Sequence, residues 1–359
     1  MQTANKIRYF LGANSPAGFY SLYDQLLPAE QARAIYILKG GPGCGKSTLM
    51  RRVAEKAEQA GEPVEYIQCS GDPDSLDGVV LTRRKIAIVD GTAPHVIEPS
   101  CPGAVESYVN LGECYDTSAL RAMRDELTAC MTGYKDCYKR AYRCLKASAE
   151  VASDTRNTLT SKALEEKILK RVKGIISREL GKPSEGSALV KKRFLSAVTH
   201  KGVVHLHTTA EVLCKRIYVL EDSYGLAHLM LSPLLSAATA AGHEVIVCPS
   251  PLDPDRIEHL LLPELSLAFL SAPHGLIWER RPYRRIRIDA MADPELLRRY
   301  RSRLRFSGKV SSALIDEAVD SLAQAKAMHD ELEKLYNPHV DFERVRHTAD
   351  ELADRILSE

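Results

Sequence analysis

Short apolar runs and helical periodicities alternate over the first hundred residues. Residues 35–38, 64–67 and 85–90 are rich in β-branched and apolar side chains, and such continuous runs are typical of strands buried on both faces of a sheet. Between the first two runs, apolar residues recur at helical spacing until Gly61, which predicts a helix ended by that glycine. Strands that alternate with a helix predict an α/β fold with a mainly parallel sheet.

Longer helices are predicted outside these segments. Residues 118–180 contain no proline and no strand pattern, and their apolar residues recur every three or four positions, which indicates an amphipathic helix. A second, highly charged helix is expected over residues 153–180, so that the pair forms a hairpin. Further helices are expected over residues 294–305, 311–336 and 341–357.

The second half of the chain repeats the first. Residues 217–220 (IYVL) match residues 35–38 (IYIL), and the two copies extend over about residues 8–117 and 192–294. Two shorter motifs also recur: Asp-Pro-Asp at 72–74 and 253–255, and Ala-Pro-His at 93–95 and 272–274. A repeat of this length indicates a duplicated structural unit.

These patterns predict two duplicated three-layer α/β units, each followed by a helical appendage. The first domain would span residues 1–180, including the helical hairpin 118–180. Residues 181–187 contain glycine, serine and proline and are expected to form a linker. The second domain would span residues 188–359 and end in the C-terminal helices.

The first copy contains a glycine-rich segment, GGPGCGKST, at residues 40–48. Gly-x-x-x-x-Gly-Lys-Ser between a strand and a helix is the phosphate-loop motif, in which glycines let backbone N–H groups surround a phosphate. We expect Lys46 to reach the β- and γ-phosphates and Ser47 to ligate Mg²⁺. The predicted nucleotide-binding residues are Gly41, Pro42, Gly43, Cys44, Gly45, Lys46, Ser47 and Thr48.

Two acidic residues complete the predicted site. Asp90 ends the third strand, where phosphate-loop proteins hold magnesium, so Ser47 and Asp90 are the expected metal ligands. Gly91 follows Asp90, so the adjacent glutamate that many motor-type ATPases use as a base is missing. Glu98, in a proline-containing loop beyond the strand, is a candidate base or an outer magnesium contact. The predicted catalytic residues are Lys46, Asp90 and Glu98.

The matching segment of the second copy lacks this chemistry. Asp222 replaces the first glycine of the loop, His228 replaces the lysine and Leu229 replaces the following serine. A loop without the lysine and the hydroxyl, and with a negative charge of its own, should not hold a triphosphate. The sequence therefore predicts that only the N-terminal site binds nucleotide.

The overall charge of the chain is nearly balanced, but one stretch is rich in arginine. The 359 residues include 49 basic and 47 acidic side chains, a net charge of +2, which excludes a globally basic nucleic-acid-binding protein. Ten arginines nevertheless occur between Arg280 and Arg305. They could bind nucleic acid or a phosphorylated partner, or supply an arginine to the nucleotide. The interpretation that we favour is a solvated face whose arginines pair with nearby acidic residues.

The cysteine spacing and the hydropathy pattern bear on metal binding and on the cellular location of the protein. Cys130, Cys137 and Cys144 are seven residues apart, a spacing that places them on one helix face and does not suit zinc. The first residues carry charges and no apolar stretch, and no apolar run approaches 18 residues, so no leader and no membrane span are expected. We therefore expect a cytoplasmic protein.

The loop resembles that of the phosphate-loop NTPase superfamily. More closely, residues 18–24, 39–48, 72–78 and 90–95 resemble an uncharacterised bacterial family of duplicated phosphate-loop proteins that are labelled ATPases. The resemblance implies ATP binding through Lys46, Ser47, Thr48 and Asp90. Members of that family keep a recognisable second phosphate loop, and this chain does not.

The function expected from the sequence is ATP binding with Mg²⁺-dependent hydrolysis at the N-terminal site. Two alternatives stay open. One is a kinase that transfers the γ-phosphoryl group to a small-molecule or protein acceptor. The other is a nucleotide-dependent switch that binds a partner, or less favourably nucleic acid, through the C-terminal half.

Overall fold

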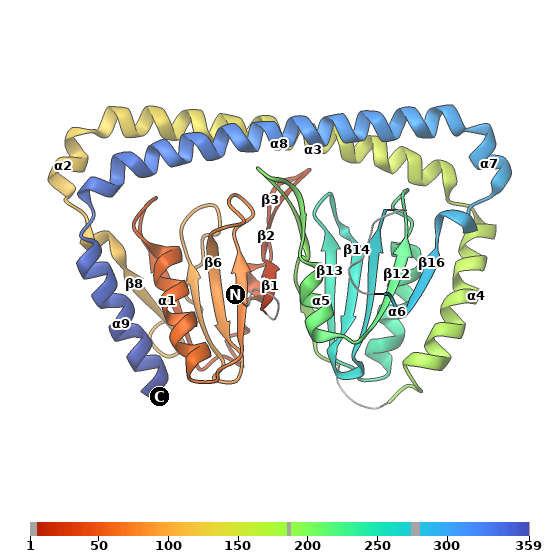
Figure 1. Ribbon diagram of the computed structural model, residues 1–359, viewed down its shortest axis with the longest axis horizontal. Coiled ribbons are helices and arrows are strands. Elements are labelled where there is room, and N and C mark those ends of the chain that lie inside the picture. Colours follow the sequence, from red (N-terminus) through yellow and green to blue (C-terminus); the bar gives the residue numbers. More distant parts are fainter. Residues whose placement is uncertain (1–5, 185–187, 274–280, 359) are drawn as a thin grey trace.

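A computed structural model of the chain describes residues 6–184, 188–273 and 281–358. Two six-stranded sheets stand side by side, and two long helices cross above both of them (Figure 1). The chain is therefore an α/β protein built from two sheet units. Three of the seven residues of the expected linker, 185–187, lie outside the described residues, as does the repeated His274.

The first sheet has the strand order β1-β5-β6-β7-β4-β8. Strand β6 runs antiparallel to both of its neighbours, and the other pairs are parallel. The expectation of a mainly parallel sheet holds for three of the five strand pairs; β6 is the exception, because the seven residues between β5 and β6 are too few for a parallel crossover. The strands are β1 (Ile7–Phe10), β4 (Ala34–Lys39), β5 (Val64–Gln68), β6 (Leu76–Leu81), β7 (Ile86–Asp90) and β8 (Glu106–Asn110).

The second sheet repeats this order strand for strand as β9-β13-β14-β15-β12-β16. Its β14 is antiparallel to both neighbours, as β6 is in the first sheet. The repeat seen in the sequence is thus a repeat of the fold. The strands are β9 (Val190–Lys192), β12 (Arg216–Glu221), β13 (Val245–Ser250), β14 (Asp253–Leu262), β15 (Leu267–Ala272) and β16 (Arg284–Arg287).

Longer helices pack on the outer face of each sheet, whereas the inner faces turn toward each other with only short helices of the described chain between them, so the two units are not separate three-layer sandwiches. The inner faces of both sheets contribute to one shared core, which joins side chains such as Ile37 and Val89 to Val219 and Leu270. Two small hairpins and helix α5 (His207–Leu213) lie between the sheets (Figure 1). The hairpins are β2 (Gly12–Ser15) with β3 (Gly18–Ser21) and β10 (Ser196–Thr199) with β11 (Gly202–His205).

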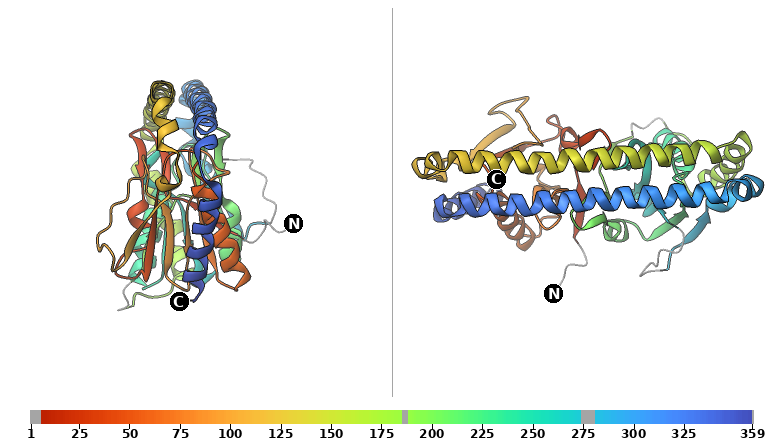
Figure 2. Two further views of the ribbon diagram at one scale, coloured as in Figure 1. Left: turned by 90° about the vertical axis from the view of Figure 1, so that its left-hand side faces the viewer. Right: turned by 90° about the horizontal axis from the view of Figure 1, so that it is seen from above.

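The long helices α3 (Arg124–Leu159) and α8 (Arg301–Tyr336) lie side by side along their length (Figure 2). Each has 36 residues, or about 50 Å at 1.5 Å per residue. The expected hairpin within residues 118–180 is therefore wrong, because α3 pairs with α8. Both helices are also longer than predicted: α3 continues to Leu159, and α8 runs unbroken through residues 306–310.

Each long helix leads to a helix on the opposite sheet unit. Helix α4 (Lys162–Glu179) follows the first copy but packs on α6 (His228–Ala240) of the second. Helix α9 (Phe342–Ser358) follows the second copy but packs on α1 (Lys46–Gln59) of the first. The two halves thus exchange their appendages. Short helices complete the described chain: α2 (Thr117–Ala122), α7 (Pro294–Arg299), η1 (Tyr23–Gln25), η2 (Leu111–Cys114), η3 (Pro263–Leu265), η4 (Asp289–Met291) and η5 (Asn337–His339).

The cysteines that the spacing places on one face of α3 lie on the face that contacts α8. The Cys130 thiol donates to the carbonyl oxygen of Met328 (3.3 Å), and Cys137 lies 3.9 Å from the Met328 sulfur. Gly133 stands between them on the same face, where an added Cβ would lie 2.7 Å from the Met328 methyl carbon. These cysteines are free thiols that serve packing.

Candidate functional site

The glycine-rich loop connects β4 to α1, and two of its glycines adopt a left-handed backbone. Gly43 has φ +68° and Gly45 has φ +86°, values that L side chains rarely adopt. The Lys46 side chain folds back over the loop, and its ammonium group donates to the carbonyl oxygens of Gly40 (2.8 Å) and Gly41 (2.9 Å). The loop therefore holds the lysine over its own concave backbone.

The structure brings Asp90 to this lysine. Strands β4 and β7 are parallel neighbours with Leu38 opposite Asp90. The C-terminal ends of the two strands therefore lie at the same edge of the sheet. The Asp90 Oδ2 atom lies 3.6 Å from Lys46 Nζ, and its Oδ1 accepts from the backbone N–H (2.8 Å) and hydroxyl (2.6 Å) of Thr92. This fixes the carboxylate beside the loop.

The remaining predicted residues occupy different places. Ser47 Oγ accepts from the Leu76 N–H (3.0 Å), which leaves its proton and one lone pair for another contact. The Glu98 carboxylate lies 3.4 Å from Lys39 Nζ and accepts from the Tyr108 hydroxyl. Those two contacts, the Tyr108 hydrogen bond first, hold the pKa of Glu98 below its usual range. The structure thus joins Glu98 to Lys39 and gives it no contact with Lys46.

The matching loop of the second copy is filled by its own side chain. The Asp222 carboxylate accepts from the backbone N–H groups of Leu226 (2.8 Å) and Ala227 (2.6 Å), and more weakly from Tyr224 (3.2 Å). Burial raises the pKa of Asp222, while these N–H groups act in the opposite direction. In this loop a carboxylate occupies the position that favours an anion.

The first copy leaves the equivalent donors unused. Cys44 and Gly45 take the positions of Leu226 and Ala227, and no hydrogen bond between described residues uses the backbone N–H of either. His228, in the place of Lys46, accepts from the Ile257 N–H through Nδ1 (3.0 Å), and burial lowers its pKa. The second loop therefore has no lysine at this position, and its Leu226 and Ala227 amides are already bonded to Asp222.

The end of α8, η5 and the start of α9, residues 329–345, lie against the first-copy loop; we call this segment the C-terminal corner. A Cβ added at Gly43 would lie 3.4 Å from both Cα and Cβ of Glu333, and one at Gly45 would lie 3.2 Å from Val345. The Asn337 side-chain amide finds hydrogen-bond partners for both its oxygen and its nitrogen when the nitrogen faces the loop. In that orientation the nitrogen donates to the Gly43 carbonyl oxygen (3.0 Å). Sequence reasoning missed this contact.

Backbone hydrogen bonds fix the corner to the first copy. The Asp116 N–H donates to the His339 carbonyl oxygen (2.9 Å), and the Asp341 N–H donates to that of Cys114 (2.8 Å). The periodicity of residues 311–336 predicted the helix, but no local signal shows that it returns to the other copy. The crossing depends on packing between α3 and α8, which are far apart in the sequence.

The arginine-rich stretch lies at the opposite end of α8 from the loop. Arg301 begins that helix and Tyr336 ends it, and the 24 residues from Arg305 to His329 separate the arginines from the C-terminal corner by about 36 Å. Arg285 lies 3.3 Å from Glu221, and Arg303 lies 2.7 Å from Asp154. These arginines therefore form ion pairs, as the favoured interpretation expects, but their acidic partners are not the ones that lie near them in the sequence.

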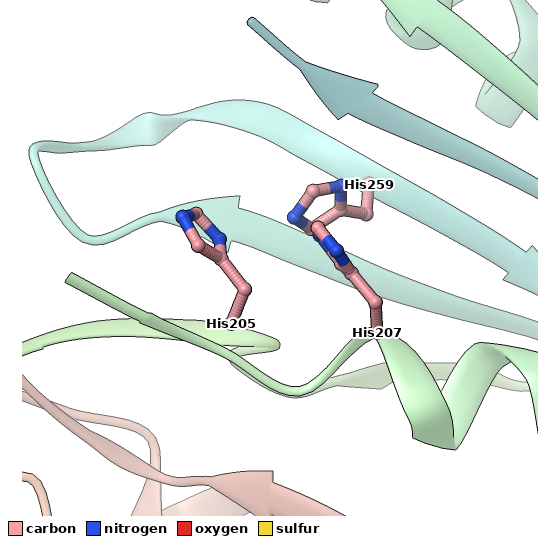
Figure 3. Close-up of side chains that lie close together, drawn as sticks. All are labelled: His205, His207 and His259. Atoms are coloured by element: carbon pink, nitrogen blue, oxygen red, sulfur yellow. The ribbon is translucent and has the colours of Figure 1, made fainter. Parts of the chain in front are cut away.

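Three histidines of the second copy also come together (Figure 3). His205 and His207 project from the end of β11 and the start of α5 toward His259 on β14. Burial lowers the pKa of all three, that of His207 to about 4. The His259 Nδ1 accepts from the Ser271 N–H (3.1 Å), so the neutral ring carries its proton on Nε2. That tautomer offers no Nε2 lone pair to a metal.

Comparison with known proteins gives one match. A model of the family described as Nephrocystin 3, N-terminal, matches residues 21–87. This segment is under a fifth of the chain and includes β4, the glycine-rich loop and α1. Searches among curated proteins and solved structures found no match. Within the described residues, none of the helices is both long and apolar enough for a membrane span.

Proposed function

We propose that the first copy is an ATP-binding phosphate-loop unit that hydrolyses ATP with the aid of Mg²⁺. The main support is the contrast between the two loops. In the second copy the loop amides bind the Asp222 carboxylate, which marks the anion position. The first copy has glycine at the position of Asp222, open amides at Cys44 and Gly45, and a lysine directly after them.

The residues beside the loop suit phosphate chemistry. Lys46 is held by two carbonyl oxygens and lies near Asp90, contacts that a phosphate can replace with stronger, charge-assisted ones. Ser47 and Asp90 offer a hydroxyl and a carboxylate, the hard oxygen donors that Mg²⁺ prefers. When bound there, Mg²⁺ would neutralise charge on the β- and γ-phosphates. The N-terminus of α1 adds favourable electrostatics for an anion.

The experiment is equilibrium binding of labelled ATP, followed by analysis of the products. We expect Lys46→Ala to weaken ATP binding at least about tenfold, the loss of one charge-assisted contact. His228→Ala changes the equivalent position of the second copy and should leave binding unchanged. Equal ATP affinity of Lys46→Ala and the wild type would rule out the proposed site.

The products separate the remaining alternatives. Free phosphate supports hydrolysis, whereas label in an added metabolite pool supports a kinase. Binding without turnover leaves the nucleotide-dependent switch. Asp90→Asn provides the matching test of the metal ligand, and we expect it to reduce the magnesium dependence of ATP binding.

A further inference from the structure

The C-terminal corner adds ionisable side chains beside the first-copy loop. Glu333 lies on the turn of α8 that faces Gly43, and its carboxylate is 3.7 Å from His329 Nδ1. The ligand atoms of His329, Asp330 and Glu333 lie within 4.8 Å of one another. All three residues are half-buried. This cluster comes from the second half of the chain, whereas Lys46 and Asp90 belong to the first.

The carboxylates at the end of α8 differ in their partners. Asp330 pairs with Lys326, and Glu331 pairs with Lys334. Among the described residues, no lysine or arginine lies within ion-pair distance of Glu333, whose one ion-pair partner is His329. Burial lowers the pKa of His329, and the charges of Lys326 and Lys46 act in the same direction, against Glu333 and Asp330. Burial therefore favours the neutral form of His329, and no lysine or arginine of the described chain pairs with the Glu333 side chain.

The position after Asp90 lacks a base. Many ATPases have a glutamate there, but this chain has Gly91, whose added Cβ would clash with Ile37. The space beside β4 thus excludes a side chain at position 91. Glu98 is tied to Lys39 and lies away from the lysine of the loop. Glu333 packs against the loop at Gly43 from a helix of the second half of the chain, whereas Asp90 comes from the first half.

We propose that the second half of the chain completes the ATP site of the first half, with Glu333 as the proton acceptor for the attacking water. This inference rests on the hydrolysis proposed above. The water oxygen bonds to the γ-phosphorus while one of its protons moves to a Glu333 carboxylate oxygen. The bond from the γ-phosphorus to the β–γ bridging oxygen breaks, and ADP leaves with its electron pair. Glu333 then releases the proton to solvent together with phosphate.

The test compares Glu333→Gln with the matched control Glu331→Gln. Both variants remove one carboxylate from the same helix, but Glu331 pairs with Lys334 and points to solvent. We expect Glu333→Gln to lower kcat about 100-fold, the scale of general-base catalysis, with KM and the ATP dissociation constant within about twofold. Glu331→Gln should match the wild type. Circular dichroism and thermal melting of both variants check that they fold.

Three results would overturn the inference. The first is a kcat of Glu333→Gln within threefold of the wild type, and the second is loss of ATP binding in that variant. The third is a wild-type protein that binds ATP without turnover. If the wild type binds no ATP at all, the proposed function itself fails, so the two failures are distinguishable.

Hydrogen exchange gives a readout that does not depend on turnover. ATP bound between the loop and the corner should slow exchange in the last three turns of α8, residues 326–336. The first three turns of the same helix, whose centre lies about 37 Å away, should not change. Absence of protection at residues 326–336 while the loop is protected would overturn the shared site.

Discussion

The two loops differ at one side chain that decides whether the loop amides are already hydrogen-bonded within the protein. Both follow a buried strand and precede a helix at the same place in the sheet order. Asp222 supplies the acceptor in the second loop, whereas glycine at position 40 has no side chain to fill the same place in the first loop. The difference is visible in the sequence, because a carboxylate in a phosphate cradle conflicts with a phosphate.

This contact predicts a stability effect for Asp222→Ala. The substitution leaves the buried N–H groups of Leu226 and Ala227 without an acceptor, so we expect the free energy of unfolding to fall by about 1–3 kcal/mol. Asp255→Ala, at an exposed position of the same copy, is the control and should change stability little. Denaturant titration measures both. Equal stability of Asp222→Ala and the wild type would contradict the role of the carboxylate.

A second prediction concerns the buried pair of His95 and Asp77. Their nearest atoms are 3.1 Å apart, and the Tyr23 hydroxyl donates to the same carboxylate (2.8 Å). Burial acts against both charges, yet Asp77 raises the pKa of His95, and His95 lowers the pKa of Asp77. The contribution of His95 is complete below its unfolded pKa of 6.5 and is lost as the pH rises through its folded pKa. That of Asp77 is complete above 3.8 and is lost as the pH falls through its folded pKa.

The pair should therefore stabilise the fold most between about pH 4 and 6.5. We expect His95→Gln to lower the free energy of unfolding by about 3–5 kcal/mol in this window, and less on either side. His347→Gln, which changes an exposed histidine paired with Glu351, is the control. Urea titrations from pH 4 to 9 measure the difference. A constant difference across that range would contradict the assigned charges.

The predictions from sequence were most accurate for single residues near the loop. The motif at residues 40–48 and the strand that ends in Asp90 bring Lys46 and Asp90 together as expected, because the motif and the acidic end of the strand can both be recognised in short stretches of sequence. Glu98 was proposed from its position in a loop, and its lysine partner could not be foreseen. ATP binding, hydrolysis and the magnesium ligands remain predictions.

At the scale of elements, the exchange of helices is the feature that the sequence concealed. The patterns located most helices, but a hydrophobic stripe does not identify the surface that it will cover. Helix α9 buries Leu352 and Ile356 against α1, although almost 300 residues separate the two helices. Helix α4 covers α6 in the same way from the first half.

This exchange predicts that α9 stabilises the first sheet unit. Ile356→Ala should lower the free energy of unfolding by about 2–5 kcal/mol, the usual cost of a large-to-small change in a core, because Ile356 is fully buried. It should also weaken ATP binding, since α1 begins at the phosphate loop. Ser358→Ala, two residues further along at an exposed position, is the control. An unchanged unfolding free energy would show that α9 is dispensable to the first unit.

At the scale of the molecule, three features join the halves. The inner faces of the sheets share a core, α3 and α8 pair along 36 residues each, and each half carries a helix on the other. Ion pairs such as Arg140–Glu317 connect the long helices near their middle. Residues 181–187 thus separate the two copies in the sequence. In the structure, however, each sheet unit contains residues from both sides of this segment.

This arrangement predicts the behaviour of a chain that is cut in two. A specific protease site placed within residues 181–187 should allow cleavage into fragments that stay together through size-exclusion chromatography without denaturant. Separation would expose the shared core and the apolar faces of α1 and α6, at roughly 25 cal/mol for each Å² of apolar surface. The uncut protein with the same inserted site is the control, and it should melt in a single transition as the cut protein does. Fragments that separate in native buffer would show that the exchanged helices do not hold the halves together.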